Sequence, residues 1–148
     1  MIQFYFLSIS LNIIGGLALC ADAPLKGGPA FAGLRTFLRD RTVRLVIAIL
    51  ACVTGGLKFV TAMRGDIPVV GDFLPAVAGI AVGGTMLLEL YSSETWASSE
   101  PDEAERAAPP PRKVSGFESF LLSNKESIGI AGILAGLLHF LFPMVIFL

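Results

Sequence analysis

The chain has 148 residues, of which 54% are hydrophobic and 16% are charged, and its mean hydropathy is +0.75. Soluble domains usually carry about 25% charged residues, so this composition excludes an ordinary soluble globular protein. The formal net charge is −1, and we expect no nucleic-acid partner.

Four apolar blocks are long enough to cross a bilayer, which takes roughly 20 mostly apolar residues. They are Ile2–Cys20, Val43–Met63, Phe73–Leu90 and Ser127–Leu148. The sequence therefore predicts an all-α integral membrane protein with one domain, residues 1–148, built from four transmembrane helices.

The first block resembles a secretory signal peptide in one respect, because Ala21 and Ala23 form an A-x-A pattern at its end. However, the opening "MIQ" has no lysine or arginine, and the apolar stretch is longer than in most signal peptides. We expect this block to be retained as a helix. In the third block, Asp72 followed by Pro75 predicts a helix start near Phe73.

The basic residues are concentrated in two of the connections between blocks. These connections carry Lys26, Arg35, Arg39, Arg41 and Arg44, and then Arg106, Arg112, Lys113 and Lys125. Loops rich in lysine and arginine face the cytoplasm. We therefore expect both long connections to be cytoplasmic and both termini to lie outside a bacterial-type inner or plasma membrane.

Each long connection also contains a short amphipathic segment. In the first segment, Phe31–Arg39, apolar side chains recur at helical spacing beside two arginines, and a similar face surrounds Phe120. Such helices lie in the membrane interface near anionic headgroups, although docking on a cytoplasmic partner is the alternative. The residues expected at the lipid interface are Arg35, Arg39, Phe37 and Phe120.

The two halves of the chain resemble one another. The motif Gly55-x-Leu57-Lys58-Phe59 aligns with Gly136-x-Leu138-His139-Phe140, and "AGLRTFL" from Ala32 aligns with "SGFESFL" from Ser115. The sequence therefore suggests two parallel repeats, residues 1–63 and 67–148. A flexible cytoplasmic linker is expected over residues 92–113, where the sequence is acidic and then proline-rich. Resemblance by composition alone is the alternative.

Small residues recur three or four positions apart in every block, which places them on one face of each helix. Such faces allow helices in lipid to pack closely. The expected packing glycines are Gly15, Gly16, Gly55, Gly79, Gly83, Gly132 and Gly136. The same faces are candidates for contact with a membrane-protein partner or a second copy of the chain.

Polar groups at membrane depth are candidates for function by default, and three such residues in the blocks are the strongest candidates. Lys58 is expected to snorkel to the outer headgroups or to pair with Asp66 or Asp72. His139 is expected to bond a neighbouring helix, and Pro143, which lacks an N–H, leaves the His139 carbonyl without its helical donor. Asn12 is expected to donate an interhelical hydrogen bond. Lys58 and His139 should lie at similar depth.

No catalytic or metal-ligand spacing is present, so we expect no enzyme activity, cofactor or metal. The lack of a carboxylate at mid-membrane argues against an ion-coupled carrier. These observations favour an accessory or scaffolding subunit of a larger membrane complex. The alternative is a small oligomeric transporter or channel in which Lys58 and His139 line an anion or solute path.

Overall fold

The computed structural model describes residues 2–22, 29–62, 69–97 and 115–142, and these residues form six helices and no strand. The predicted all-helical fold is therefore confirmed for the described residues. In chain order the helices are α1 (Ile2–Leu19), α2 (Pro29–Arg39), α3 (Arg41–Ala62), α4 (Val69–Ala97), α5 (Gly116–Ser123) and α6 (Lys125–Leu141).

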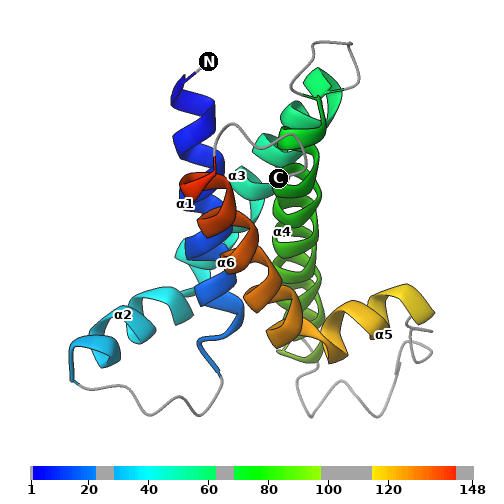
Figure 1. The fold of residues 1–148 in the computed structure, drawn as a ribbon. Coiled ribbons are helices and arrows are strands. Elements are labelled where there is room, and N and C mark those ends of the chain that lie inside the picture. The colour runs from blue at the N-terminus through cyan, green and yellow to red at the C-terminus, as the bar shows by residue number, and fades with distance from the viewer. Residues whose placement is uncertain (1, 23–28, 63–68, 98–114, 143–148) are drawn as a thin grey trace.

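Four long helices form a column, and two short helices diverge from one end of it. The column consists of α1, α3, α4 and α6, whose most extensive pairings are α3 with α4 and α1 with α6 (Figure 1). Helices α2 and α5 extend away from the column at the end where α1 finishes and α6 begins (Figure 1). This arrangement gives the molecule one broad end and one narrow end.

Two to three of these helices are long and apolar enough to cross a membrane. Arg41–Val60 of α3 and Phe73–Ser92 of α4 each meet this criterion alone. Helices α5 and α6 meet it only together, and they are bent by 69° at their junction. Helix α1 is apolar but shorter. The four predicted spans are thus all helical within the described residues, while length and composition qualify only two or three as spans.

Local capping interactions mark where α3 and α5 begin. Asp40 separates α2 from α3, and its side chain accepts a 3.0 Å hydrogen bond from the Val43 N–H, as an N-cap residue does. Helix α5 begins with a capping box, in which Ser115 and Glu118 accept each other's backbone N–H. A defined polar residue therefore precedes both α3 and α5.

Helix α4 is longer than the sequence predicted at both ends. It begins at Val69, so Pro75 lies inside the helix rather than in its first turn. Membrane helices tolerate internal proline because neighbouring helices satisfy the freed backbone groups. At the other end α4 continues to Ala97, since the next helix-breaking residue is Pro101. Residues 92–97 of the predicted linker are therefore helical, and residues 98–113 lie outside the described residues.

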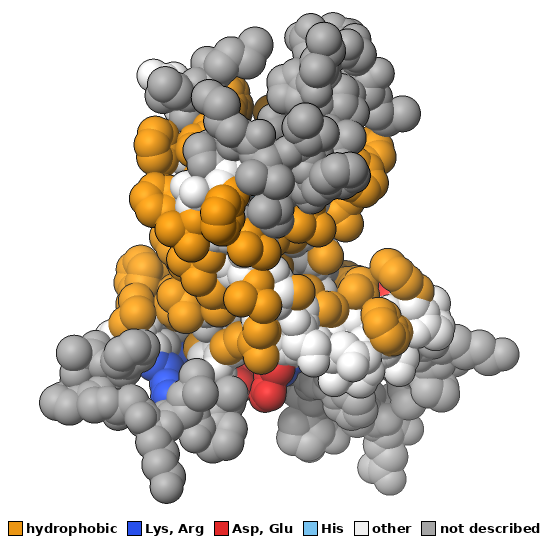
Figure 2. Space-filling model, viewed as in Figure 1, with side chains coloured by type: hydrophobic (Ala, Val, Ile, Leu, Met, Phe, Trp, Pro, Cys, Tyr) orange, Lys and Arg blue, Asp and Glu red, His pale blue; other side chains and the backbone are white. Residues whose placement is uncertain are grey.

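The surface of the column is apolar between its two ends. On the face shown in Figure 2, hydrophobic side chains cover the column, and the visible charged side chains lie at the broad end. The two short helices each bury one leucine against the column, Leu38 from α2 and Leu121 from α5. Phe37 of α2 and Phe117 and Phe120 of α5 stay exposed.

All seven predicted packing glycines lie where one helix approaches another. A Cβ added at Gly83 would lie 2.7 Å from the Ala48 carbonyl oxygen of α3, and one at Gly55 would lie 2.8 Å from the Ala76 carbonyl oxygen of α4. Gly15, Gly16, Gly79, Gly132 and Gly136 are similarly close to neighbouring helices. These faces are occupied within the chain, so most of the small-residue surface serves the fold itself.

A pair of adjacent glycines tests this packing. A methyl group at Gly83 would meet backbone and the Cys52 sulfur, whereas one at Gly84 would meet nothing within 4 Å. We expect Gly83→Ala to lower the free energy of unfolding by about 1–3 kcal/mol, the usual cost of overpacking. Gly84→Ala should be neutral or stabilising, because alanine favours helix.

Thermal unfolding of the purified protein in detergent would measure both variants. Gly55→Ala and Gly56→Ala form a second matched pair, since a Cβ at Gly56 also meets nothing within 4 Å. Equal melting temperatures for the two members of each pair would contradict the packing described here.

Candidate functional site

Three polar side chains from three helices meet near the narrow end of the column. Tyr5 comes from α1, Lys58 from α3 and His139 from α6. The Lys58 Nζ lies 3.2 Å from the His139 Nε2 and 5.7 Å from the centre of the Tyr5 ring. The Tyr5 and His139 ring centres are 4.7 Å apart. Lys58 and His139, predicted to lie at similar depth, are in direct contact.

The backbone of α6 contributes to this polar cluster. Residue 143 is a proline and has no N–H to donate to the His139 carbonyl four residues earlier. The Tyr5 hydroxyl donates a 2.6 Å hydrogen bond to that carbonyl. A tyrosine on α1 therefore supplies the donor that the helix itself lacks, and it fixes the end of α6 against α1.

Lys58 does not follow the snorkelling path expected from the sequence. Lys58 is 8% exposed and His139 is 4% exposed, so the ammonium group is directed into the bundle. The backbones of α3 and α6 do not approach each other within the described residues. The long lysine side chain reaches across that separation, which is why a lysine suits this position. The side chains of Asp66 and Asp72 lie outside the described residues.

Asn12 links α1 to α4 at a separate point. Its Nδ2 donates a 3.0 Å hydrogen bond to the Pro75 carbonyl, which makes it the interhelical donor that the sequence indicated. Its Oδ1 is buried and has no hydrogen-bond partner among the described residues. A Cβ at Gly79 would lie 3.3 Å from this oxygen. The glycine therefore makes room for the amide.

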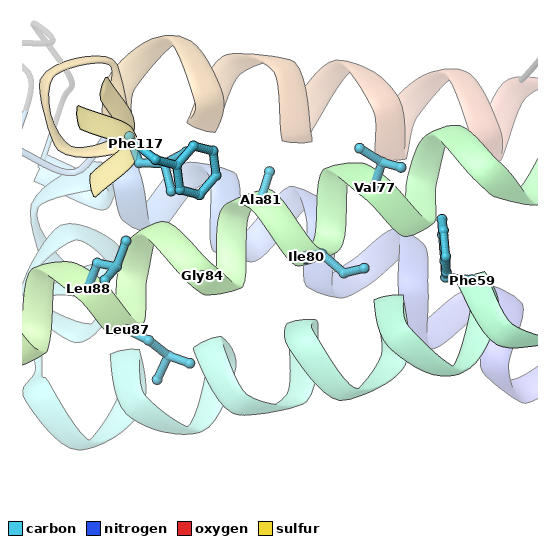
Figure 3. Close-up of a pocket in the computed structure, with 9 residues that line it drawn as sticks. Phe59, Val77, Ile80, Ala81, Gly84, Leu87, Leu88 and Phe117 are labelled. Atoms are coloured by element: carbon cyan, nitrogen blue, oxygen red, sulfur yellow. The ribbon is translucent and has the colours of Figure 1, made fainter. Parts of the chain in front are cut away.

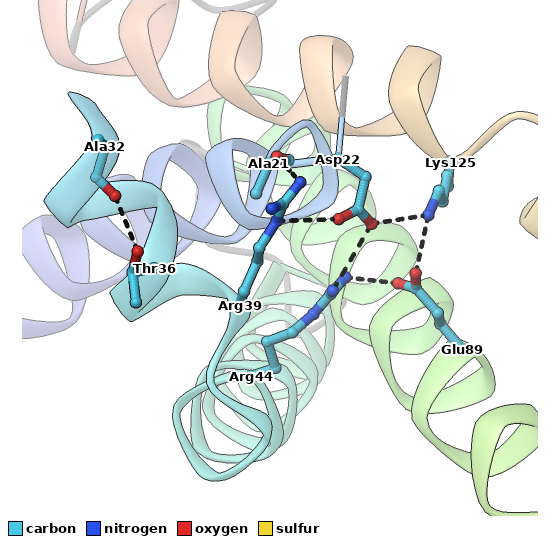
Figure 4. Close-up of polar contacts among 8 residues, drawn as sticks. All are labelled: Ala21, Asp22, Ala32, Thr36, Arg39, Arg44, Glu89 and Lys125. Atoms are coloured by element: carbon cyan, nitrogen blue, oxygen red, sulfur yellow. Dashed lines mark hydrogen bonds and ion pairs between the residues drawn. The ribbon is translucent and has the colours of Figure 1, made fainter. Parts of the chain in front are cut away.

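A second polar cluster, which we call the charge network, closes the broad end of the column (Figure 4). Lys125 Nζ lies 3.0 Å from Asp22 Oδ2 and 2.8 Å from Glu89 Oε1. Arg44 pairs with Glu89 and lies 3.9 Å from Asp22. Arg39 Nε lies 3.3 Å from Asp22 Oδ1. The network joins the end of α1 to α2, α3, α4 and α6.

Sequence reasoning missed this network. The Glu89 side chain is only 21% exposed and binds both Arg44 and Lys125. A signal was present, since Arg44 and Lys125 are separated by the same 81 residues as Lys58 and His139. The proposed repeat therefore relates the two cations at the broad end as well as the pair at the narrow end.

The charge network changes the acidity of Asp22. Partial burial alone raises the pKa of this carboxyl, but the hydrogen bond from Lys125 and the charges of Lys125, Arg44 and Arg39 outweigh that effect. The pKa of Asp22 therefore lies below its ordinary value. The folded state favours the ionised carboxylate, because Lys125, Arg44 and Arg39 are all cations.

The four residues predicted at the lipid interface have different surroundings. Phe37 is 57% exposed and Phe120 is 59% exposed, so both aromatic rings are available to contact lipid. Arg35 is half-buried on α2. Arg39 donates to the Ala21 carbonyl at 3.1 Å and pairs with Asp22. Arg39 therefore binds the chain itself in addition to any headgroup it reaches.

An apolar groove of about 590 Å³ runs along α4, between Phe59 of α3 and Phe117 of α5 (Figure 3). Every side chain that lines it is hydrocarbon, so it offers no polar group to orient a substrate. Its walls are formed by Phe59, Val77, Ile80, Ala81, Gly84, Leu87, Leu88, Phe117 and Leu121.

The described residues contain no group of three side chains arranged to hold a metal ion. Cys20 and Cys52 are both free thiols. The chemistry of the described residues is therefore that of two polar clusters, one at each end, and an apolar groove between them.

Comparison with known proteins gives one relative over the full chain. The chain is 31% identical over 148 residues to an uncharacterized protein of Treponema pallidum (strain Nichols), and the alignment covers 100% of both proteins. A protein-family model also matches residues 1–139. No solved structure matches the chain.

Breaking the charge network at Glu89 should destabilise the protein. Glu89→Gln leaves Arg44, whose side chain is 10% exposed, without its closest counter-charge. We expect the free energy of unfolding to fall by about 2 kcal/mol, as for other charged hydrogen bonds that lose one partner. Glu126→Gln, at an exposed position on α6, is the control and should change it by under about 0.5 kcal/mol. Thermal unfolding in detergent compares the two, and similar losses would contradict the network's role.

Acid should weaken the same network through Asp22. Because its pKa is lowered in the folded state, the carboxylate contributes stability above the pKa it has in the unfolded chain, about 4. That contribution is lost as the pH falls through the folded pKa. The melting temperature of the native protein should therefore drop more steeply below about pH 4 than that of Asp22→Asn. Parallel pH profiles would exclude this role for Asp22.

Proposed function

This chain belongs to the same protein family as the Treponema pallidum protein over its full length, and from its own residues we propose that it is a non-enzymatic accessory or scaffolding subunit of a larger membrane complex. One observation carries the proposal: the polar side chains inside the bundle bond other helices of the same chain. Lys58 contacts His139 at 3.2 Å, and Asn12 donates to the Pro75 carbonyl. These contacts hold the bundle together, which is the requirement of a scaffold.

The proposal includes four membrane spans. Its support is that α1 and α6 pack along the two helices that are long enough to span, within one column (Figure 1). At 1.5 Å per residue, the 18 residues of α1 and the 17 of α6 extend roughly 26 Å. That length nearly matches the hydrocarbon core of about 30 Å, and the residues that follow α6 in the sequence are apolar.

The proposed orientation places α2 and α5 at the cytoplasmic face of a bacterial-type inner or plasma membrane, with both termini outside. Both short helices leave the same end of the column (Figure 1), as two connections on one side require. The exposed rings of Phe37 and Phe120 suit the acyl boundary, and Arg35 suits anionic headgroups. The lipid partner is therefore an anionic bilayer surface.

The proposal also includes an internal duplication. In such a duplication, α1, α2 and α3 correspond to α4, α5 and α6. A two-fold relation between the halves then makes the α1–α6 contact equivalent to the α3–α4 contact. It also makes the α1–α3 contact equivalent to the α4–α6 contact. The helix contacts follow that pattern. The α1–α6 and α3–α4 contacts are the two most extensive, and the α1–α3 and α4–α6 contacts are similar to each other in extent. Leu38 and Leu121, aligned in the two halves, are the buried leucines of the two short helices. Equivalent residues near a two-fold axis meet, as Lys58 and His139 do.

The subunit role is supported by apolar surface that the fold leaves uncovered. The groove along α4 is lined by hydrocarbon alone, and Gly84 beside it has open space around its Cα. The spanning helices use their small-residue faces for one another, so this side of α4 is the part of the column that a neighbouring membrane protein or second copy would contact.

Two measurements on the full-length protein test the proposal. The first is purification from its native membrane in mild detergent with quantification of bound proteins, for which we expect a membrane-protein partner at constant stoichiometry. The Ala81→Phe variant, which fills the groove, should lose that partner. Leu137→Phe, at an exposed site on α6 away from the groove, is the matched control and should retain it.

The second measurement is solute and anion flux through proteoliposomes that contain the pure protein. The scaffold proposal expects flux no greater than in empty liposomes. Flux that the pure protein supports and Lys58→Met abolishes would overturn it in favour of a transporter or channel that uses Lys58 and His139.

A further inference from the structure

The groove along α4 has the size of a ligand site and lies at membrane depth. Its volume of about 590 Å³ falls within the range of ligand pockets, about 300–1,000 Å³. Its α4 wall runs from Val77 to Leu88, inside the segment Phe73–Ser92 that is long and apolar enough to cross a membrane. Phe59 and Phe117 lie toward its two ends (Figure 3).

The lining of the groove suits a hydrocarbon chain. Every lining side chain is hydrocarbon, so a polar group placed among them would lose its hydrogen bonds to water without replacement. Only Ala81 and Gly84 are small, and the other lining residues are large. A rigid helix would leave gaps between large side chains, whereas a flexible acyl chain adapts to them. At 1.5 Å per residue, the wall from Val77 to Leu88 is about 16 Å long, close to half of the hydrocarbon core of about 30 Å.

The stripe of α4 that forms the groove ends at a tyrosine. Tyr91 lies seven residues after Gly84 and four after Leu87, which places it on the same face of the helix, one turn closer to the broad end. Its side chain is 53% exposed. Tyrosine is enriched at the level of lipid headgroups, because its ring is apolar and its hydroxyl is polar. The groove therefore leads from the apolar interior to the headgroup level.

An arginine of α3 lies at the same level. Arg44 pairs with Glu89, and Gly55 lies against Ala76, so α3 and α4 run antiparallel. Arg41 comes one turn before Arg44 and is therefore level with the part of α4 that follows Glu89.

Arg41 also lies on the groove side of α3. It comes eighteen residues before Phe59, which is five full turns of 3.6 residues. The two residues thus share one face of the helix, and Phe59 lines the groove. The side chain of Arg41 is exposed.

The side chains at this end suit an anionic headgroup. A guanidinium has five N–H donors and binds phosphate through two parallel hydrogen bonds, so Arg41 can hold a phosphate in addition to its contacts within the chain. Glu89 projects from the opposite side of α4, where Arg44 and Lys125 bind it. Its negative charge is therefore directed away from the groove and balanced within the charge network.

We propose that the groove binds an anionic phospholipid, with an acyl chain along α4 from Leu88 to Val77 and the headgroup phosphate at Arg41 and Tyr91. The inference rests on the membrane placement proposed above, in which the broad end faces the cytoplasm. It specifies what fills the groove where this side of α4 faces a neighbouring subunit: the subunit contacts α4 over the bound chain.

A matched pair of glycine variants tests the position of the acyl chain. A Cβ at either Gly84 or Gly56 would meet nothing within 4 Å, so leucine fits at both, but only Gly84 lines the groove. Native mass spectrometry of the pure full-length protein, titrated with phosphatidylglycerol, should show one lipid bound more tightly than any further lipid. Gly84→Leu should lose this first lipid and Gly56→Leu should keep it. Equal occupancy in the two variants would overturn the proposal.

A second pair of variants tests the position of the headgroup. The native protein should bind phosphatidylglycerol about fivefold more tightly than zwitterionic phosphatidylcholine, and Arg41→Gln should remove that preference. Arg35→Gln, which removes a charge from α2, is the control and should keep it. A preference that survives in Arg41→Gln would overturn the proposal.

Photolabelling tests the same site in the native protein, without any substitution. Phosphatidylglycerol with a diazirine in its acyl chain, mixed into nanodiscs, should label the stretch from Val77 to Leu88 more than the exposed Ile130 and Leu134 of α6. Equal labelling of the two surfaces would contradict the site.

These measurements use the protein without a partner, so their outcome is independent of whether a partner copurifies. A purified dimer or partner complex whose mass includes no phospholipid would assign the groove to protein and overturn the lipid site, while leaving the subunit role intact.

Discussion

The close approach of helix backbones at glycine is the constraint on which the rest of this structure depends. Gly83 lets α4 contact the backbone of α3, and Gly16 lets α1 contact α6 at Gly129. In lipid, helices gain little from hiding apolar surface, so they associate through close packing of small residues and through polar contacts. With helices this close, a side chain such as Asn12 can reach a backbone carbonyl on the next helix.

The two polar clusters hold the column at opposite ends and differ in kind. The charge network at the broad end is partly exposed, joins three cations to two carboxylates and holds the end of α2 to the end of α1. In the cluster of Tyr5, Lys58 and His139, the lysine and the histidine are buried, and its contacts join α6 to α1 and α3.

Much of the fold followed from periodicity and composition. The apolar blocks predicted the bounds of α1 and α3 to within a few residues. The spacing of small residues identified the seven glycines that lie at helix contacts. Both signals are local in the sequence. The ends of α4 were placed wrongly, since Pro75 resembles a first-turn proline but is accommodated inside the helix. For the candidate site, Lys58 and His139 were found because polar groups in apolar blocks are rare. Glu89 was not singled out, because it lies at the end of an apolar block, where side chains are usually exposed.

The sequence by itself determined an all-helical chain and the polar residues inside its apolar segments. It also determined that the His139 carbonyl has no N–H donor at residue 143, which is a proline. These depend on side-chain chemistry and on spacing along one helix. Only the tertiary structure decided which polar groups meet: Tyr5 with the His139 carbonyl, Lys58 with His139, and Arg44 with Glu89. Such contacts join residues far apart in the chain, and their partners are set by which helices pack together and at what depth.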